Sequence, residues 1–163
     1  VCRFQGHCAR FYSVAEHSVY VARVLWCRSS GLSDSERRFR ALFGLLHDSG
    51  EAYLADVSRP VKRFVRVENS AFSVVEERIV SAVWEALCPG VERDPRWWVE
   101  CHLADDALLE RERLDLFPDC PKFPGLDCEP APVDLECLGP ENAKALFLAS
   151  FRILSGGSSD VGA

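Results

Sequence analysis

Two serine–glutamate pairs, each followed by apolar residues at helical spacing, constrain the fold of this chain more than any other feature. Ser13 with Glu16 and Ser33 with Glu36 match the capping box that begins a helix. The apolar positions are Val14, Val21, Val24 and Leu25 after the first pair, and Phe39, Leu42, Phe43, Leu45 and Leu46 after the second. We therefore expect two amphipathic helices here, the first ending at Gly31.

The rest of the chain continues this helical character. We expect further helices from Pro60 to about Leu87, from Pro95 to about Leu116, and over 141–154. The segments between and before them are expected to be an extended lead-in over residues 1–12, a short helix or loop over 51–59, and a proline-rich irregular crossover over 118–140. No segment shows the alternation of a strand. The predicted fold class is all-α: a single helical bundle of about five to seven helices over residues 1–154. Residues 155–163 are expected to form a mobile tail, and the lack of any methionine predicts that an N-terminal segment is missing.

Composition narrows the class of function. Lys and Arg number 19 against 25 Asp and Glu, for a net charge of −6, which argues against a nucleic-acid polymer as partner. No apolar run reaches the roughly 20 residues that span a bilayer, so we expect no membrane partner. The eight cysteines form no C-x-x-C pair and are expected to stay reduced, as in a cytoplasmic protein.

The residues that indicate chemistry are His17, the pair His47-Asp48, and Asp105, each on or beside a different predicted helix. Taken singly, a helical histidine is commonly a hydrogen-bonded core residue, and Asp105 beside Asp106 is compatible with solvated charge. Together, imidazole and carboxylate ligands suit a divalent Mn, Co, Zn, Fe or Mg ion. The apolar run Phe-Gly-Leu-Leu before His47 would bury the helix and hold the pair rigidly.

This ligand order resembles that of the HD-domain phosphohydrolase superfamily: a histidine, then a histidine–aspartate pair, then an aspartate. The segments RFQGHCARFYSVAEHSVYVAR, ALFGLLHDSGEAYLADVSRPVKR and ADDALLERERLDL are similar to the small HD hydrolases of phages and bacteria that cleave deoxynucleotides, and GPENAKALFLASFRIL is similar to their closing helix. The resemblance covers residues 3–154. Such relatives include phage dATP triphosphohydrolases and, more distantly, bacterial 5'-deoxynucleotidases.

The resemblance implies a role for each matching residue. The metal ligands would be His17, His47, Asp48 and Asp105, and the catalytic group that positions or deprotonates water would be Glu51. Arg3 and Lys62 would bind phosphate and stabilise its charge, with Arg59, Arg63 and Arg66 adding positive charge nearby. Phe4 would stack on the nucleobase, Gly6 would leave room at its edge, and Asp56 would lie near the sugar.

The expected function is metal-dependent hydrolysis of a deoxynucleotide. The favoured substrate is a dNTP, dATP above the others, cleaved to deoxynucleoside and triphosphate. One alternative is a 5'-deoxynucleotidase that acts on dNMPs, and another is a non-catalytic HD module that senses nucleotides. The resemblance also implies a homo-oligomer, a dimer or higher, located in the cytoplasm, or in the host cytoplasm if the chain is phage-encoded.

Overall fold

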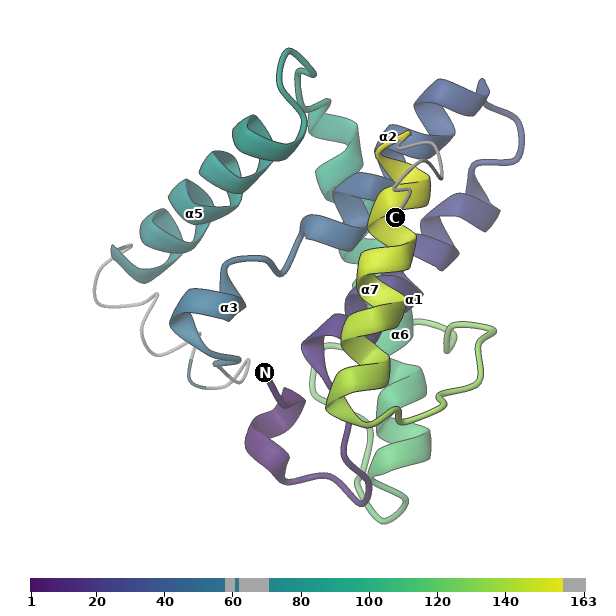
Figure 1. Ribbon diagram of the computed structural model, residues 1–163. Coiled ribbons are helices and arrows are strands. Elements are labelled where there is room, and N and C mark those ends of the chain that lie inside the picture. Colours follow the sequence, from purple (N-terminus) through teal and green to yellow (C-terminus); the bar gives the residue numbers. More distant parts are fainter. Residues whose placement is uncertain (58–60, 62–70, 157–163) are drawn as a thin grey trace.

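The computed structural model describes residues 1–57, 61 and 71–156 of the chain (Figure 1). Its elements, in chain order, are the 3-10 turn η1 (Arg3–Gly6) and the helices α1 (Val14–Arg28), α2 (Asp34–Leu46), α3 (Glu51–Leu54), α5 (Ala71–Leu87), α6 (Pro95–Leu116) and α7 (Pro140–Leu154). Within the described residues the only extended pairing is an isolated bridge between Cys2 and Ser13. The predicted all-α fold is confirmed.

The two predicted helix starts are both present, but only one is a full capping box. Ser33 and Glu36 bond reciprocally at the start of α2. At the start of α1 the Ser13 hydroxyl accepts from the Glu16 N–H. The Glu16 side chain does not bond back to Ser13, because it accepts the backbone N–H groups of Cys137 and Leu138, each at 2.8 Å. Glu16 therefore ties α1 to the crossover before α7.

Helix α1 ends at Arg28, three residues before the predicted stop at Gly31. The reason lies in Ser29, whose hydroxyl donates to the carbonyl of Leu25 at 2.7 Å and whose N–H donates to Trp26. Serine at this position satisfies carbonyl groups that helix continuation would otherwise have bonded. The helix is shortened at the end that lies away from His17, so its contribution to the predicted site is unaffected.

The core forms where α1 and α2 pack against each other, with α6 and α7 closing it from the sides. In Figure 1, α7 runs along α1 and α2, whereas α5 lies to one side of these helices. An aromatic group joins α5 to the core through Phe43, Trp84 and Trp97, with ring centroids about 6 Å apart. The run Phe43 to Leu46 at the end of α2 is wholly buried, as predicted.

Gly44 permits the close approach of α2 to α1. A Cβ atom at this position would overlap Cδ1 of Leu25 and would lie 3.3 Å from Cγ1 of Val21. Because α2 ends two residues later at Leu46 and His47 follows as its C-cap, this contact also sets how near His47 comes to α1. The small residue is therefore part of what brings the two histidines together.

Replacing Gly44 with alanine is expected to destabilise the protein by about 1–3 kcal/mol, because overpacking a tight core forces side chains and backbone apart. Urea unfolding monitored by circular dichroism measures this change. Gly31→Ala is the matched control, since a Cβ at Gly31 meets no atom within 4 Å. Equal stability of the two variants would contradict the importance of this helix contact.

Other predicted boundaries are close to those observed. Helix α6 spans the predicted range, α5 ends at Leu87 as predicted, and α7 begins one residue early at Pro140, a favoured first position for proline. The lead-in is not wholly extended, because η1 interrupts it with positive φ angles at Phe4 and Gln5. The predicted helix start at Pro60 and most of the tail lie outside the described residues. No helix in the described part of the chain has the length and apolarity needed to cross a membrane.

Candidate metal centre

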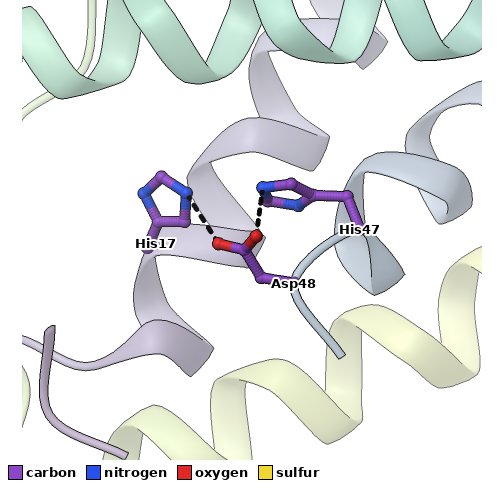
Figure 2. Close-up of side chains that lie close together, drawn as sticks. All are labelled: His17, His47 and Asp48. Atoms are coloured by element: carbon purple, nitrogen blue, oxygen red, sulfur yellow. Dashed lines mark ion pairs between the residues drawn. The ribbon is translucent and has the colours of Figure 1, made fainter. Parts of the chain in front are cut away.

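His17, His47 and Asp48 meet at the junction of α1 and the end of α2. His17 is fully buried in the first turn of α1, while His47 and Asp48 directly follow the last residue of α2. One potential ligand atom from each lies within 4.8 Å of the others, so the three form a group that could hold a metal ion. Figure 2 shows the Asp48 carboxylate between the two imidazole rings, with one oxygen directed to each.

Each histidine ring is oriented by a hydrogen bond at its Nδ1 atom. Nδ1 of His47 lies 2.7 Å from the carbonyl oxygen of Gly44, and Nδ1 of His17 lies 2.6 Å from Oε1 of Glu112. A carbonyl oxygen can only accept, so the proton of neutral His47 is on Nδ1. The Glu112 carboxylate likewise accepts from Nδ1–H of His17. In the neutral form of each ring the lone pair of Nε2 therefore faces the interior of the site.

The two Nε2 atoms converge on Asp48. The distance to an Asp48 oxygen is 3.5 Å from His17 and 3.3 Å from His47. Both Nε2 atoms are buried, and within the described residues neither makes a hydrogen bond of acceptable geometry. Buried ring nitrogens with this orientation are costly unless another group satisfies them. A divalent cation fits this donor set of imidazole nitrogen and carboxylate oxygen.

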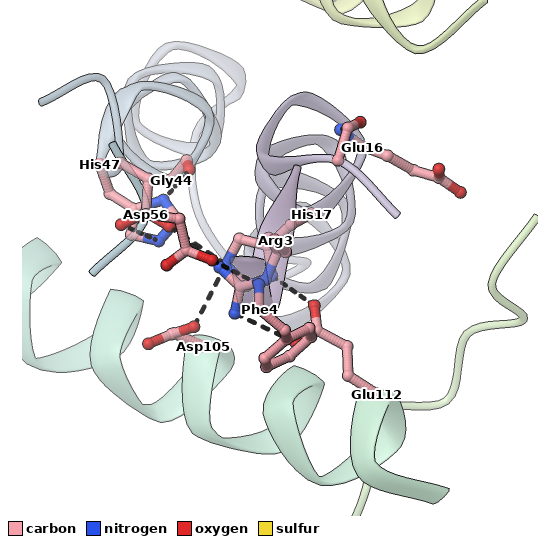
Figure 3. A network of polar contacts seen from close by, with 11 residues as sticks. Arg3, Phe4, Glu16, His17, Gly44, His47, Asp56, Asp105 and Glu112 are labelled. Carbon is pink, nitrogen blue, oxygen red and sulfur yellow. Dashed lines mark hydrogen bonds and ion pairs between the residues drawn. The ribbon is translucent and has the colours of Figure 1, made fainter. Parts of the chain in front are cut away.

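Asp105 approaches the same point from α6. Its Oδ1 atom lies 3.2 Å from Nε2 of His17, although it is not within 4.8 Å of every atom of the group above. The four residues predicted as ligands thus lie close together, brought there by α1, the end of α2 and α6; Figure 3 shows His17, His47 and Asp105 among them. Asp105 is distant in sequence from the other three residues, and the packing of α6 against α1 brings it to them.

The charges at the site shift the pKa values of its members. Burial raises the pKa of Asp48, but the nearby His47 and His17 outweigh it and hold that pKa far below its usual range. Burial likewise opposes a fall in the pKa of Asp105, which His17 and His47 nevertheless lower. For His17, burial and Arg3 lower the pKa, whereas Glu112 and Asp105 raise it, with a net rise to about 9. Both aspartates are therefore ionised at neutral pH.

Arg3 lies beside the group of potential metal ligands, with its side chain buried. Its Nη1 is 3.4 Å from Oδ2 of Asp48, and its Nη2 donates to Oε2 of Glu112 at 3.1 Å. The backbone fixes this position, because the N–H of Arg3 donates to Tyr12 at 2.9 Å, and η1 then turns the chain away through its two left-handed residues. A guanidinium next to the ligands can bind an anion held there.

Glu51 is also placed at the site. It is the first residue of α3, its side chain is buried, and its N–H donates to the carbonyl of Asp48 at 2.9 Å. The tight turn Asp48–Glu51 therefore connects a potential ligand to the predicted catalytic acid. Because this turn is short, the three-residue spacing keeps Glu51 close to Asp48.

The remaining predicted residues have mixed outcomes. The N–H of Phe4 donates to Asp56 at 2.6 Å, and the Phe4 ring packs edge-on against Phe117 at 4.9 Å while staying partly exposed. Gly6 is exposed, with φ of +80° and open space around its Cα. Lys62, Arg59, Arg63 and Arg66 lie outside the described residues.

A cavity of about 830 Å³ lies between α5 and α6 and reaches the group of ligands. His47, Asp48 and Asp105 line one end of it, and Trp98 and His102 line another part. Its volume falls within the usual range of small-molecule sites, roughly 300–1,000 Å³. Three of the potential ligands, His47, Asp48 and Asp105, therefore face a cavity large enough for a small molecule.

Sequence reasoning missed Glu112, the fully buried carboxylate that contacts both His17 and Arg3. It lies in the charged run Glu-Arg-Glu-Arg, where alternating charge resembles a solvated helix face. A usable signal was its spacing, since seven residues after Asp105 is two helical turns on the same face of α6.

Comparison with known proteins places the chain in a family. No family model matches it. A protein of Escherichia coli (strain K12) named "Uncharacterized protein YfdR" is 33% identical over 159 residues, which make up 95% of this chain and 78% of that protein. At this identity and coverage the two share a fold and a common origin, and the chain belongs to the family of YfdR.

Proposed function

We propose that this chain is a metal-dependent phosphohydrolase of the HD superfamily that acts on a deoxynucleotide. The observation that carries the proposal is the convergence of two buried imidazole Nε2 atoms on the Asp48 carboxylate, at 3.5 and 3.3 Å. Both rings are fixed through Nδ1, as metal-ligating histidines are. Asp105 lies 3.2 Å from His17, Arg3 lies 3.4 Å from Asp48, and Glu51 begins the turn of helix after Asp48, which supports the roles that the HD resemblance implies for them.

The cation would be held by His17, His47, Asp48 and Asp105. When bound, a divalent ion at such a site supplies Lewis acidity: it polarises a phosphoryl oxygen and acidifies water. The donor set is compatible with Mn, Co, Zn, Fe or Mg. The two aspartates are ionised at neutral pH and offset the charge of the cation.

The chain's own groups would supply binding and proton transfer. Nη1 of Arg3 faces the ligands, so Arg3 would bind a phosphoryl oxygen and stabilise the negative charge that builds on it. Glu51 would orient the attacking water and accept its proton. The cavity between α5 and α6 would receive the nucleoside or the phosphate chain.

The proposed substrate is a dNTP, with dATP favoured, and the proposed products are deoxynucleoside and triphosphate. Incubation of the protein with each dNTP and dNMP, in the presence of Mn, Co, Zn or Mg, tests this directly. Chromatography of the phosphate product distinguishes triphosphate from orthophosphate. Orthophosphate from dNMPs alone would replace the triphosphate proposal with a 5'-deoxynucleotidase, and no turnover of either class with any metal would refute the enzyme.

Metal binding is expected to strengthen as pH rises from 7 to 9. In the metal-free protein the pKa of His17 is raised to about 9, by Glu112 and Asp105 against the opposing effects of burial and Arg3, so His17 is protonated below that pH. A cation bound to Nε2 must displace one proton, and the apparent Kd should fall about tenfold per pH unit until His17 is neutral. Calorimetric titration with Mn²⁺ in buffers of different ionisation enthalpy measures the proton release. A pH-independent Kd over this range would contradict it.

A further inference from the structure

We infer that Glu112 is a positioning residue that fixes both a metal ligand and the phosphate-binding arginine, an inference that rests on the proposed function of the site. Its two carboxylate oxygens have different partners. Oε1 lies 2.6 Å from Nδ1 of His17, and Oε2 accepts from Nη2 of Arg3 at 3.1 Å. Glu112 is 0% exposed, so no water competes for these two bonds.

The bond to His17 determines which nitrogen faces the site. The carboxylate accepts from Nδ1–H and so keeps a proton on that nitrogen, while Nε2 faces Asp48 and Asp105 and is the nitrogen that a cation would take up in exchange for its proton. His47 achieves the same orientation with a backbone carbonyl, that of Gly44. Glu112 thus orients His17 as the helix backbone orients His47. Of these two Nδ1 partners, only the Glu112 side chain can be removed by substitution.

The bond to Arg3 restrains its guanidinium, which would otherwise compete with a metal ion for the carboxylate oxygens of Asp48. Arg3 is buried and contacts two carboxylates, but the distance to Glu112 is shorter than the 3.4 Å to Asp48. Without Glu112, Asp48 would be the carboxylate that the described residues leave in contact with the buried guanidinium, which would then neutralise a potential metal ligand. Glu112 thereby restrains Arg3 and leaves Asp48 available to the cation; Figure 3 shows Glu112 in contact with both Arg3 and His17.

The geometry of α6 supports this combined role. Asp105 and Glu112 are two turns apart on one helix, and both contact His17, on its Nε2 and Nδ1 atoms respectively. The helix thus presents a potential ligand and the group that orients a second ligand from the same face. A displacement of α6 would disturb both contacts together.

Glu112→Gln tests the inference, because an amide has one acceptor oxygen where two donors need one each. The expected result is a 10- to 100-fold weaker Kd for Co²⁺, the usual cost of losing the partner of a ligating histidine. Co²⁺ titration followed by visible absorption measures the Kd and the ligand geometry without any substrate. Glu110→Gln is the matched control, since Glu110 is also buried on α6 and pairs with an arginine, Arg113, at 2.8 Å.

A second measurement uses the unaltered chain and so does not depend on the folding of a variant. Long-range ¹H–¹⁵N NMR of the Zn²⁺-loaded protein reports the protonated nitrogen of each histidine. The expected state of His17 is a proton on Nδ1 and no proton on Nε2; a metal on Nδ1 would overturn the inference.

The two proposals can fail separately. If the unaltered chain binds none of the metals, the proposed function falls with the inference. If it binds Co²⁺ and Glu112→Gln binds as tightly as Glu110→Gln, the inference alone is overturned and the metal centre stands.

Discussion

Asp48→Asn is expected to lower kcat/KM for the deoxynucleotide substrate by about 10³-fold, because a bound metal supplies several kcal/mol of transition-state stabilisation and Asp48 is central to its site. The carboxylate directs one oxygen to each histidine, so it contacts both imidazole ligands at once. An asparagine of nearly the same shape keeps the packing but removes the charge. In one of its two orientations, the amide would also direct an N–H donor toward Nε2 of His17 or His47.

Metal affinity should fall in parallel with activity in this variant, which Co²⁺ titration measures. The control is Asp34→Asn at the other end of α2, about 20 Å away at 1.5 Å per helical residue. Both variants should retain the helical circular dichroism of the parent chain. Full activity in Asp48→Asn would show that turnover does not use this group of ligands.

Local sequence patterns predicted the parts of the fold that depend on neighbours in the chain. The capping box of Ser33 and Glu36 and the proline at the start of α6 each act within one turn, so their residues alone indicate the helix starts. The buried run before His47 was likewise readable, because apolar residues at helical spacing must face a core.

The contacts that complete the site were not readable in this way. The carboxylate of Glu16 bonds to backbone groups more than 120 residues away, and Glu112 reaches His17 across 95 residues. A glutamate that will be buried by a distant helix has the same local pattern as one that will face water. The four potential ligands were predicted only because their order resembles a known superfamily; spacing alone left each one compatible with an ordinary core or surface role.

The position of His47 and Asp48 shows how geometry at a helix end differs from that inside a helix. Consecutive residues of a helix point about 100° apart and would not share a target. His47 is the C-cap of α2 and keeps helical dihedral angles. The chain then turns tightly: the N–H of Ser49 donates to the carbonyl of Leu46, and the N–H of Glu51 donates to the carbonyl of Asp48. This turn brings the Asp48 carboxylate between the two imidazole rings and begins α3 at Glu51, three residues later.

Glu51→Gln is expected to separate catalysis from metal binding. Loss of a general base lowers kcat by roughly 10²- to 10⁴-fold. Glu51 is not among the residues that form the candidate metal group, so the Kd for Co²⁺ should change by less than a few-fold. This pattern differs from that of Asp48→Asn, in which both quantities change together. Single-turnover hydrolysis at saturating substrate, with Co²⁺ titration of the same sample, measures the two effects.

The conservative variant Glu51→Asp refines the test, because it keeps the carboxylate but withdraws it by one methylene group. If Glu51 handles the proton of the attacking water, this variant should recover part of the lost kcat, with a pH profile like that of the parent chain. If Glu51 acts only through its backbone N–H bond to Asp48, which survives either substitution, both variants should instead keep the kcat and the metal affinity of the parent chain. A kcat reduced less than tenfold in Glu51→Gln would assign the proton transfer to another group at the site.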